Sequence, residues 1–138
     1  NFRVEEGHPN CIEGLKRPLH TIIPGMVLDH NGLSSLSYGV MGGQYQPVGQ
    51  VHVLNNILDF EMSPQQAITF PRAFHFNNVY KLEKEVSEEI KDGLSTIGHN
   101  AVHVDETHGG GQAIQINRLK GNLIGGSDPR KDGYAKGY

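Results

Sequence analysis

An Asn–Gly pair between two apolar runs is the feature that most constrains how this chain can fold. Asn31–Gly32 separates residues 19–29 from residues 33–43, and both turn residues tolerate the positive φ of a tight hairpin. Pro24–Gly25 interrupts the first run, which is typical of a bulge or an edge strand. The second run alternates apolar residues and ends at Gly42–Gly43. The sequence therefore predicts an antiparallel hairpin with bare backbone at its end.

Helical signals follow the hairpin. After Pro47, apolar residues recur at helical spacing and predict the face of a helix that packs on the core. These residues are Val48, Val51, Leu54 and Leu58, with Val53 and Ile57 widening the stripe. A capping box at Ser63, Pro64 and Gln66 predicts the start of a second helix. Phe70–Pro71 ends that helix, because a residue before proline avoids the helical region.

Strands and a third helix complete the pattern. Alternation predicts a single strand over residues 74–82. Ser87 is the expected N-cap of a third helix, and Gly98 its residue C′. The apolar stripe of this helix is Ile90, Leu94 and Ile97. A short strand follows at residues 100–106, and a closing hairpin turns near Lys120–Gly121.

This order predicts one α+β domain with mainly antiparallel strands over residues 1–138, preceded by an irregular lead-in at residues 1–18. Gly makes up 18 of the 138 residues, which favours turns and hairpins over a helical bundle. A net charge of −3 gives no basis for binding nucleic acid or an anionic membrane. No apolar run reaches the roughly 20 residues that span a bilayer. The single cysteine, Cys11, is interpreted as a free structural thiol.

Three features could carry chemistry. Gly42–Gly43 offers two amides without side chains near a helix start, which suits an oxyanion pocket, although a plain turn would use the same residues. Gly109–Gly111 lacks the Lys–Ser/Thr of a phosphate loop and is interpreted as a hairpin end. His103, Asp105 and His108 could approach a metal ion, but no further ligand stands at a suitable spacing. We therefore expect no metal and interpret these side chains as solvated loop residues.

Several motifs occur in the order found in the gamma-glutamyltransferase family. They are KRPLHTIIPGM, VMGGQYQPVGQVHVLNNILDFEMSPQQAI, PR, GGGQAI and GGSDPRKDGYAKGY. The chain resembles the C-terminal part of the small subunit of that family, over about residues 14–138. The resemblance implies part of an N-terminal-nucleophile hydrolase fold, a four-layer αββα sandwich with two stacked sheets between helical layers. It also implies an enzyme without a cofactor.

The resemblance assigns roles to four residues. Family members cleave themselves to expose a threonine that attacks a gamma-glutamyl amide, and the acyl group then passes to water or an amine. The paired glycines form the oxyanion hole in that family, which places this role on Gly42 and Gly43. His20 and Thr21 stand where well-known transpeptidases have two serines that hold the substrate carboxylate. His20 could alternatively face inward and bond to the backbone. Valine at either glycine is expected to remove turnover and leave the fold intact.

Arg72 and Arg130 match arginines of the family pattern, and we interpret both as buried, bidentate structural clamps. The chain begins without methionine, and the nucleophilic threonine is expected upstream of Asn1. The fragment alone is then inactive and pairs with the remainder of the same precursor. Association of identical chains and the cellular location stay open. Because His20 replaces a serine, a glutaryl or cephalosporin-type acylase is an alternative, and the missing nucleophile leaves a non-catalytic binding module as another.

Overall fold

The computed structural model describes residues 2–138. The first hairpin that the sequence predicts is present. Strand β1 (Pro24–Leu28) pairs antiparallel with β2 (Ser34–Met41). Strand β1 is an edge strand that starts five residues later than expected, and its bulge lies at Val27/Leu28 instead of at the proline. The turn also differs, since only Gly32 of the Asn–Gly pair has a positive φ, at 76°. The Asp29 side chain accepts hydrogen bonds from the amides of Asn31 and Leu33 and so fixes the loop.

The closing hairpin completes a four-stranded sheet. Strand β6 (Gly110–Asn117) pairs antiparallel with β2 and with β7 (Asn122–Ser127), which gives the order β1-β2-β6-β7. The expected turn near Lys120–Gly121 is confirmed, with Gly121 at φ 64°. The pairing of β2 with β6 aligns Met41 with Gly110. This register places the end of β2 beside the start of the glycine run.

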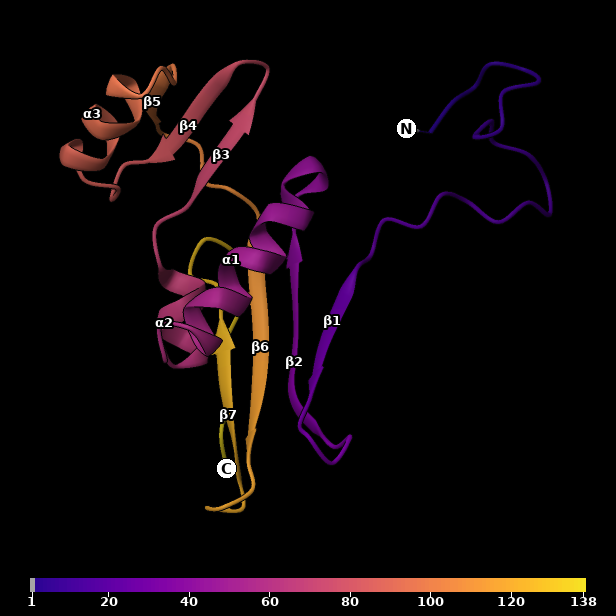
Figure 1. The fold of residues 1–138 in the computed structure, drawn as a ribbon. Helices are drawn as coiled ribbons and strands as arrows, with labels where there is room; N and C mark the ends of the chain where they lie inside the picture. The colour runs from indigo at the N-terminus through magenta and orange to yellow at the C-terminus, as the bar shows by residue number, and fades with distance from the viewer. Residues whose placement is uncertain (1) are drawn as a thin grey trace.

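Two helices cover one face of this sheet (Figure 1). Helix α1 (Gln46–Leu58) packs against β2, and α2 (Pro64–Thr69) packs against β6 and β7. The predicted capping box at Ser63 and Gln66 is confirmed. The Gln65 side chain adds two hydrogen bonds to the backbone of Ser127 on β7.

Only part of the predicted apolar stripe of α1 packs on the sheet. Val53 and Ile57 are buried, whereas Val48, Val51 and Leu58 are each about half exposed. The reason is Gly49, where a Cβ would lie 2.7 Å from Val40 Cγ1 on β2. Because this glycine allows the closest approach of helix and sheet, the residues four and eight positions later turn inward.

The predicted strand 74–82 is wrong, because it is a second hairpin. Strand β3 (Ala73–Phe76) pairs antiparallel with β4 (Val79–Glu83) around Asn77 and Asn78, whose φ values are 50° and 59°. Positive φ at both positions of a two-residue loop defines a type I′ turn. Helix α3 (Glu88–Thr96) then leads to β5 (Ala101–Val104), which pairs parallel with β4. This small sheet lies beyond one end of the larger one (Figure 1).

The Asn77–Asn78 turn provides a stability test. Alanine at Asn78 is expected to lower the free energy of unfolding by about 1–2 kcal/mol, because a Cβ disfavours the left-handed region when no side-chain amide compensates. Glycine at the same position adopts this φ without steric cost and is expected to be neutral or stabilising. Urea unfolding of both variants measures the difference. Equal stability of the two would contradict the turn type.

The predicted start and end of the third helix are confirmed. Ser87 caps α3 by accepting a hydrogen bond from the Ile90 amide, and Gly98 follows the helix at φ 95°. The stripe of α3 is largely uncovered, with Ile90 54% and Ile97 72% exposed. Apart from turns, residues 2–23 contain only an isolated bridge, Arg3 to Cys11, and the N-terminal part of this segment extends away from the sheet (Figure 1). No helix in residues 2–138 combines the length and apolarity needed to cross a membrane.

Candidate active site

The Gly42–Gly43 turn joins β2 to α1 through a short 3-10 helix at Gly43–Tyr45. The φ values are 139° at Gly42 and 57° at Gly43, both in the range that favours glycine. Their carbonyl groups accept hydrogen bonds from the amides of Tyr45 and Gln46. Their own amides have no acceptor within residues 2–138. The turn therefore leaves two adjacent donors available to a bound group.

The two glycines differ in the space around them. A Cβ on Gly42 would lie 2.9 Å from the Gly109 Cα and 3.3 Å from Tyr45, whereas a Cβ on Gly43 meets no atom within 4 Å. The expectation that valine at Gly42 leaves the fold intact is therefore wrong, because backbone atoms of Gly109 would have to move. Gly43 is the position at which the turn can be tested without a collision.

An open cavity of about 440 Å³ lies in front of this turn. Its lining includes Gly42, Gly43, Thr21 and Gln46. The Gln46 side chain donates a hydrogen bond of 3.0 Å to the carbonyl oxygen of Thr21, and Gln50 binds that of Ile23. Two glutamines of α1 thus hold the chain before β1 against the cavity.

Of the two residues predicted to contact substrate, only Thr21 lines this cavity. His20 is exposed and is not part of the lining. The alternative in which His20 faces inward and bonds to the backbone is wrong.

The buried side chain of Tyr45 packs beside the Gly42–Gly43 turn. Its ring is 2% exposed and packs edge-on against Phe74 at a centroid distance of 5.5 Å. The His108 ring lies 5.7 Å away. Burial raises the pKa of Tyr45 to about 12, although nearby Arg72 acts in the opposite direction. The phenol therefore stays protonated at neutral pH and cannot serve as a general base there.

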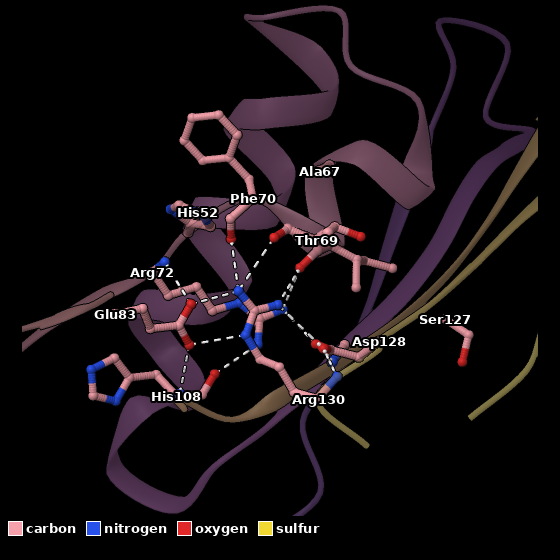
Figure 2. Close-up of polar contacts among 12 residues, drawn as sticks. His52, Ala67, Thr69, Phe70, Arg72, Glu83, His108, Ser127, Asp128 and Arg130 are labelled. Atoms are coloured by element: carbon pink, nitrogen blue, oxygen red, sulfur yellow. Dashed lines mark hydrogen bonds and ion pairs between the residues drawn. The ribbon is translucent and has the colours of Figure 1, made fainter. Parts of the chain in front are cut away.

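Arg72, Glu83, Asp128 and Arg130 form a largely buried charged cluster (Figure 2). The Arg72 guanidinium lies 2.7 Å from Asp128, and both side chains are fully buried. Arg72 also donates to the carbonyl oxygens of His108 and Ile68, at 2.7 and 2.9 Å. Its contacts thus join three separate segments of the chain.

The second half of the charged cluster centres on Glu83, which is 2% exposed. Arg130 binds this carboxylate through two nitrogens, at 2.9 and 2.5 Å. The amides of Arg72 and His108 complete its shell at 2.9 and 2.8 Å. Two positive and two negative charges balance within this cluster, and each carboxylate is hydrogen-bonded as burial of a charge requires.

The charged cluster shifts the protonation of its carboxylates. Burial by itself would raise the pKa of Glu83, but hydrogen bonds from Arg130 and from two backbone amides outweigh it and lower the pKa. At Asp128 burial would also raise the pKa. The hydrogen bond from the Arg130 amide and the charge of Arg72 outweigh burial and lower the pKa. Burial and Arg72 lower the pKa of His52, which lies in α1. Both carboxylates are therefore charged, and His52 neutral, in the folded protein near pH 7.

These shifts predict acid sensitivity. A group whose pKa is lower in the folded state stabilises the fold above its unfolded value, and this contribution is lost as the pH falls. The free energy of unfolding is therefore expected to decrease below pH 6.5, the ordinary value of His52, and more steeply below 4.5, that of Glu83. Denaturant unfolding at a series of pH values measures this. A flat curve from pH 7 to 3 would contradict the prediction.

The histidine group considered for a metal does not converge. His103 bonds to the Val86 carbonyl and lies beside Glu88, while Asp105 pairs with Lys84. His108 is buried rather than solvated, and its ring faces the Lys81 carbonyl. Within residues 2–138 no three His, Cys, Asp or Glu side chains could together hold a metal ion.

Sequence reasoning found the arginines of the charged cluster but not its carboxylates. Glu83 ends β4, where a charged residue reads as solvent-facing. Asp128 lies in the same SDPR motif as Arg130, which is the signal that could have found it. Gln46 and Gln50 were missed for a similar reason, because polar residues one turn apart on a helix usually face water.

Comparison with known proteins places these features in a class. The protein superimposes on cephalosporin acylase from Bacillus halodurans with a TM-score of 0.82 and 35% identity, covering 100% of this chain and 27% of that one. Against gamma-glutamyltranspeptidase from Pseudomonas nitroreducens in complex with L-DON, the TM-score is 0.78 at 27% identity, covering 96% and 69%. The fold is therefore part of an N-terminal-nucleophile hydrolase, an α+β sandwich with mainly antiparallel sheets.

The family follows from the sequence matches. The family model described as Gamma-glutamyltranspeptidase matches residues 1–138, and the chain belongs to this family. It is 35% identical to the glutathione hydrolase-like YwrD proenzyme of Bacillus subtilis over 99% of this chain and 27% of that protein. The chain thus spans about a quarter of the length of the curated relatives it matches.

Proposed function

We propose that this chain is the C-terminal part of the small subunit of an enzyme that cleaves gamma-glutamyl amides through an acyl-enzyme. In this proposal residues 1–138 act as one unit, and Gly42 and Gly43 donate their amides to the oxyanion of the tetrahedral intermediate. The observation that carries the proposal is the pair of adjacent amides without acceptors at the edge of a cavity. Such donors stabilise a transition state by about 3–4 kcal/mol each.

The nucleophile belongs to the remainder of the precursor. A threonine there attacks the amide carbonyl carbon, the carbon–nitrogen bond breaks, and the amine leaves with the proton of the hydroxyl group. Water or a second amine then attacks the ester and restores the threonine. The names of relatives as proenzymes, and the quarter of their length that this chain covers, support a longer precursor.

The larger sheet offers a surface for that remainder. Its face opposite α1 and α2 carries Met26, Ile114 and Leu123, which are 48–64% exposed. The register aligns Met26 with Ser37 and Ser37 with Ile114, so these side chains lie in one row; Leu123, opposite Ile116, lies on the same face in the next row. A second sheet from the rest of the precursor would cover this row in the four-layer sandwich.

Thr21 and His20 are proposed to contact the acyl part of the substrate. The Thr21 backbone is fixed at the cavity by Gln46, and its hydroxyl group can hold a carboxylate. His20 stands beside it and gives this position a titratable side chain. An acylase that prefers glutaryl amides is the second candidate, favoured by His20 and by the 35% identity to cephalosporin acylase.

A substrate panel on the full-length, processed protein tests these proposals. We expect a higher kcat/KM for a gamma-glutamyl anilide than for glutaryl amides, and an acyl-enzyme adduct on threonine by mass spectrometry. The reverse preference would support the acylase. Absence of both turnover and adduct would leave a non-catalytic binding module.

A further inference from the structure

We propose that the charged cluster positions the oxyanion turn, acting through the segment His108–Gly111 that lies between them. This inference rests on the proposed function of Gly42 and Gly43, and adds Glu83 and Asp128 as positioning residues. The cluster does not line the cavity within residues 2–138. Its influence on the reaction would be transmitted through the contacts of this segment.

The cluster holds both ends of this segment. Glu83 accepts a hydrogen bond of 2.8 Å from the His108 amide, and Arg72 donates one of 2.7 Å to the His108 carbonyl oxygen. At the other end Asp128 accepts a hydrogen bond of 2.7 Å from the Gly111 amide. All of these groups are buried, so water does not compete for them. The position of the segment is therefore set by three charge-assisted hydrogen bonds.

Gly109, in the middle of the segment, is in close contact with the Gly42–Gly43 turn. A Cβ on Gly109 would lie 2.2 Å from the Met41 carbonyl oxygen and 2.8 Å from the Tyr45 ring. A Cβ on Gly42 would lie 2.9 Å from the Gly109 Cα. Backbone therefore meets backbone without an intervening side chain, and a displacement of Gly109 must move the turn. Packed interfaces of this kind transmit small shifts because they contain no space to absorb them.

The backbone of Gly109 couples the two contacts. Its φ is 63°, so the peptide plane between residues 108 and 109 is set in an orientation that suits glycine. The same plane carries the His108 carbonyl group that Arg72 holds. Alanine at Gly109 would favour rotation of this plane and would add a methyl group against Met41. Both effects would move the segment away from the turn, while none of the residues of the charged cluster is replaced.

Gly109→Ala in the full-length protein tests the inference, with Gly121→Ala as the matched control. Gly121 has φ 64° and open space at its Cβ, so it shares the backbone strain without the contact. We expect the Gly109 variant to lose about 100-fold in kcat, comparable to loss of one oxyanion donor. KM should change less than about threefold, because the Thr21 side of the cavity is not touched. The control should keep kcat within about twofold.

Glu83→Asp is the second variant, and it decides the question if the first does not fold. It keeps the charge but shortens the side chain by one methylene, so the hydrogen bonds to His108 and Arg130 cannot both persist. A lower kcat at unchanged KM supports positioning. Equal kcat in parent and variants, or a rise in KM that accounts for the whole loss, would overturn it.

The experiment distinguishes failure of the proposed function from failure of this inference. A parent protein that turns over no amide overturns that function and this inference with it. An active parent with an insensitive Gly109 variant overturns the inference alone. In the double variant of Glu83→Asp and Gly109→Ala the two losses should combine to less than their product, because both move the same segment.

Discussion

Replacing Arg72 by methionine is expected to lower the free energy of unfolding by about 3–5 kcal/mol. The side chain is fully buried, and its removal leaves Asp128 with one fewer positive partner in a site that water does not reach. The carbonyl oxygens of Ile68 and His108 lose a donor at the same time. Methionine fills much of the volume, so lost polar contacts, not a cavity, dominate the effect.

Urea unfolding measures this loss as a lower midpoint with an unchanged slope. The control is Lys84→Met, since Lys84 pairs with Asp105 at 2.7 Å but is 66% exposed. An exposed pair is screened by water, and this variant should leave the midpoint unchanged. A midpoint shift as small for Arg72 as for Lys84 would contradict the view that burial gives the charged cluster its importance.

A double variant separates the two causes of the loss. Arg72→Met combined with Asp128→Leu removes the carboxylate together with its partner. Much of the stability should then return, because no charge is left buried without a partner in that half of the cluster. The Gly111 amide would remain unpaired, so the recovery should be incomplete. Failure of the second substitution to recover any stability would assign the cost to packing.

Local signals predicted most of the elements correctly. The capping residues Ser63 and Ser87 and the turn at Gly121 act on neighbouring residues, and the structure contains each of them. Asn77–Asn78 was missed because alternation continues through it, although asparagine tolerates positive φ. In such a case the periodicity of a strand conceals a turn that adds only two residues.

Which part of the apolar stripe of α1 is buried could not be predicted from its own residues. Its apolar stripe reads clearly, yet Val48 and Val51 are exposed and the buried face follows Gly49. Which glycine permits close packing depends on Tyr45 and Val40, and the latter lies on another element. Long-range contacts of this kind are also the reason that Glu83 and Asp128 escaped notice, since Glu83 meets Arg130 across 47 residues of chain and Asp128 meets Arg72 across 56.

Replacing Gly43 by alanine is expected to lower kcat by about 10²–10³-fold, the loss measured when one oxyanion donor is removed. The φ of Gly43 is 57°, and a Cβ makes this conformation costlier by about 1–2 kcal/mol. The strain can be relieved by rotating the peptide plane between residues 42 and 43. That plane carries the Gly43 amide itself, so relief of strain turns the proposed donor away from the cavity.

Gly32→Ala is the matched control, because Gly32 has φ 76° and no atom within 4 Å of its Cβ position. Alanine introduces a similar backbone strain at both positions, so the unfolding midpoints of the two variants should fall by similar amounts. Only the Gly43 variant should lose kcat, at a KM close to that of the parent. If Gly43→Ala keeps full turnover on every amide tested, the unpaired amides are a feature of the turn alone. If the two variants lose turnover equally, general strain and not donor geometry governs the rate.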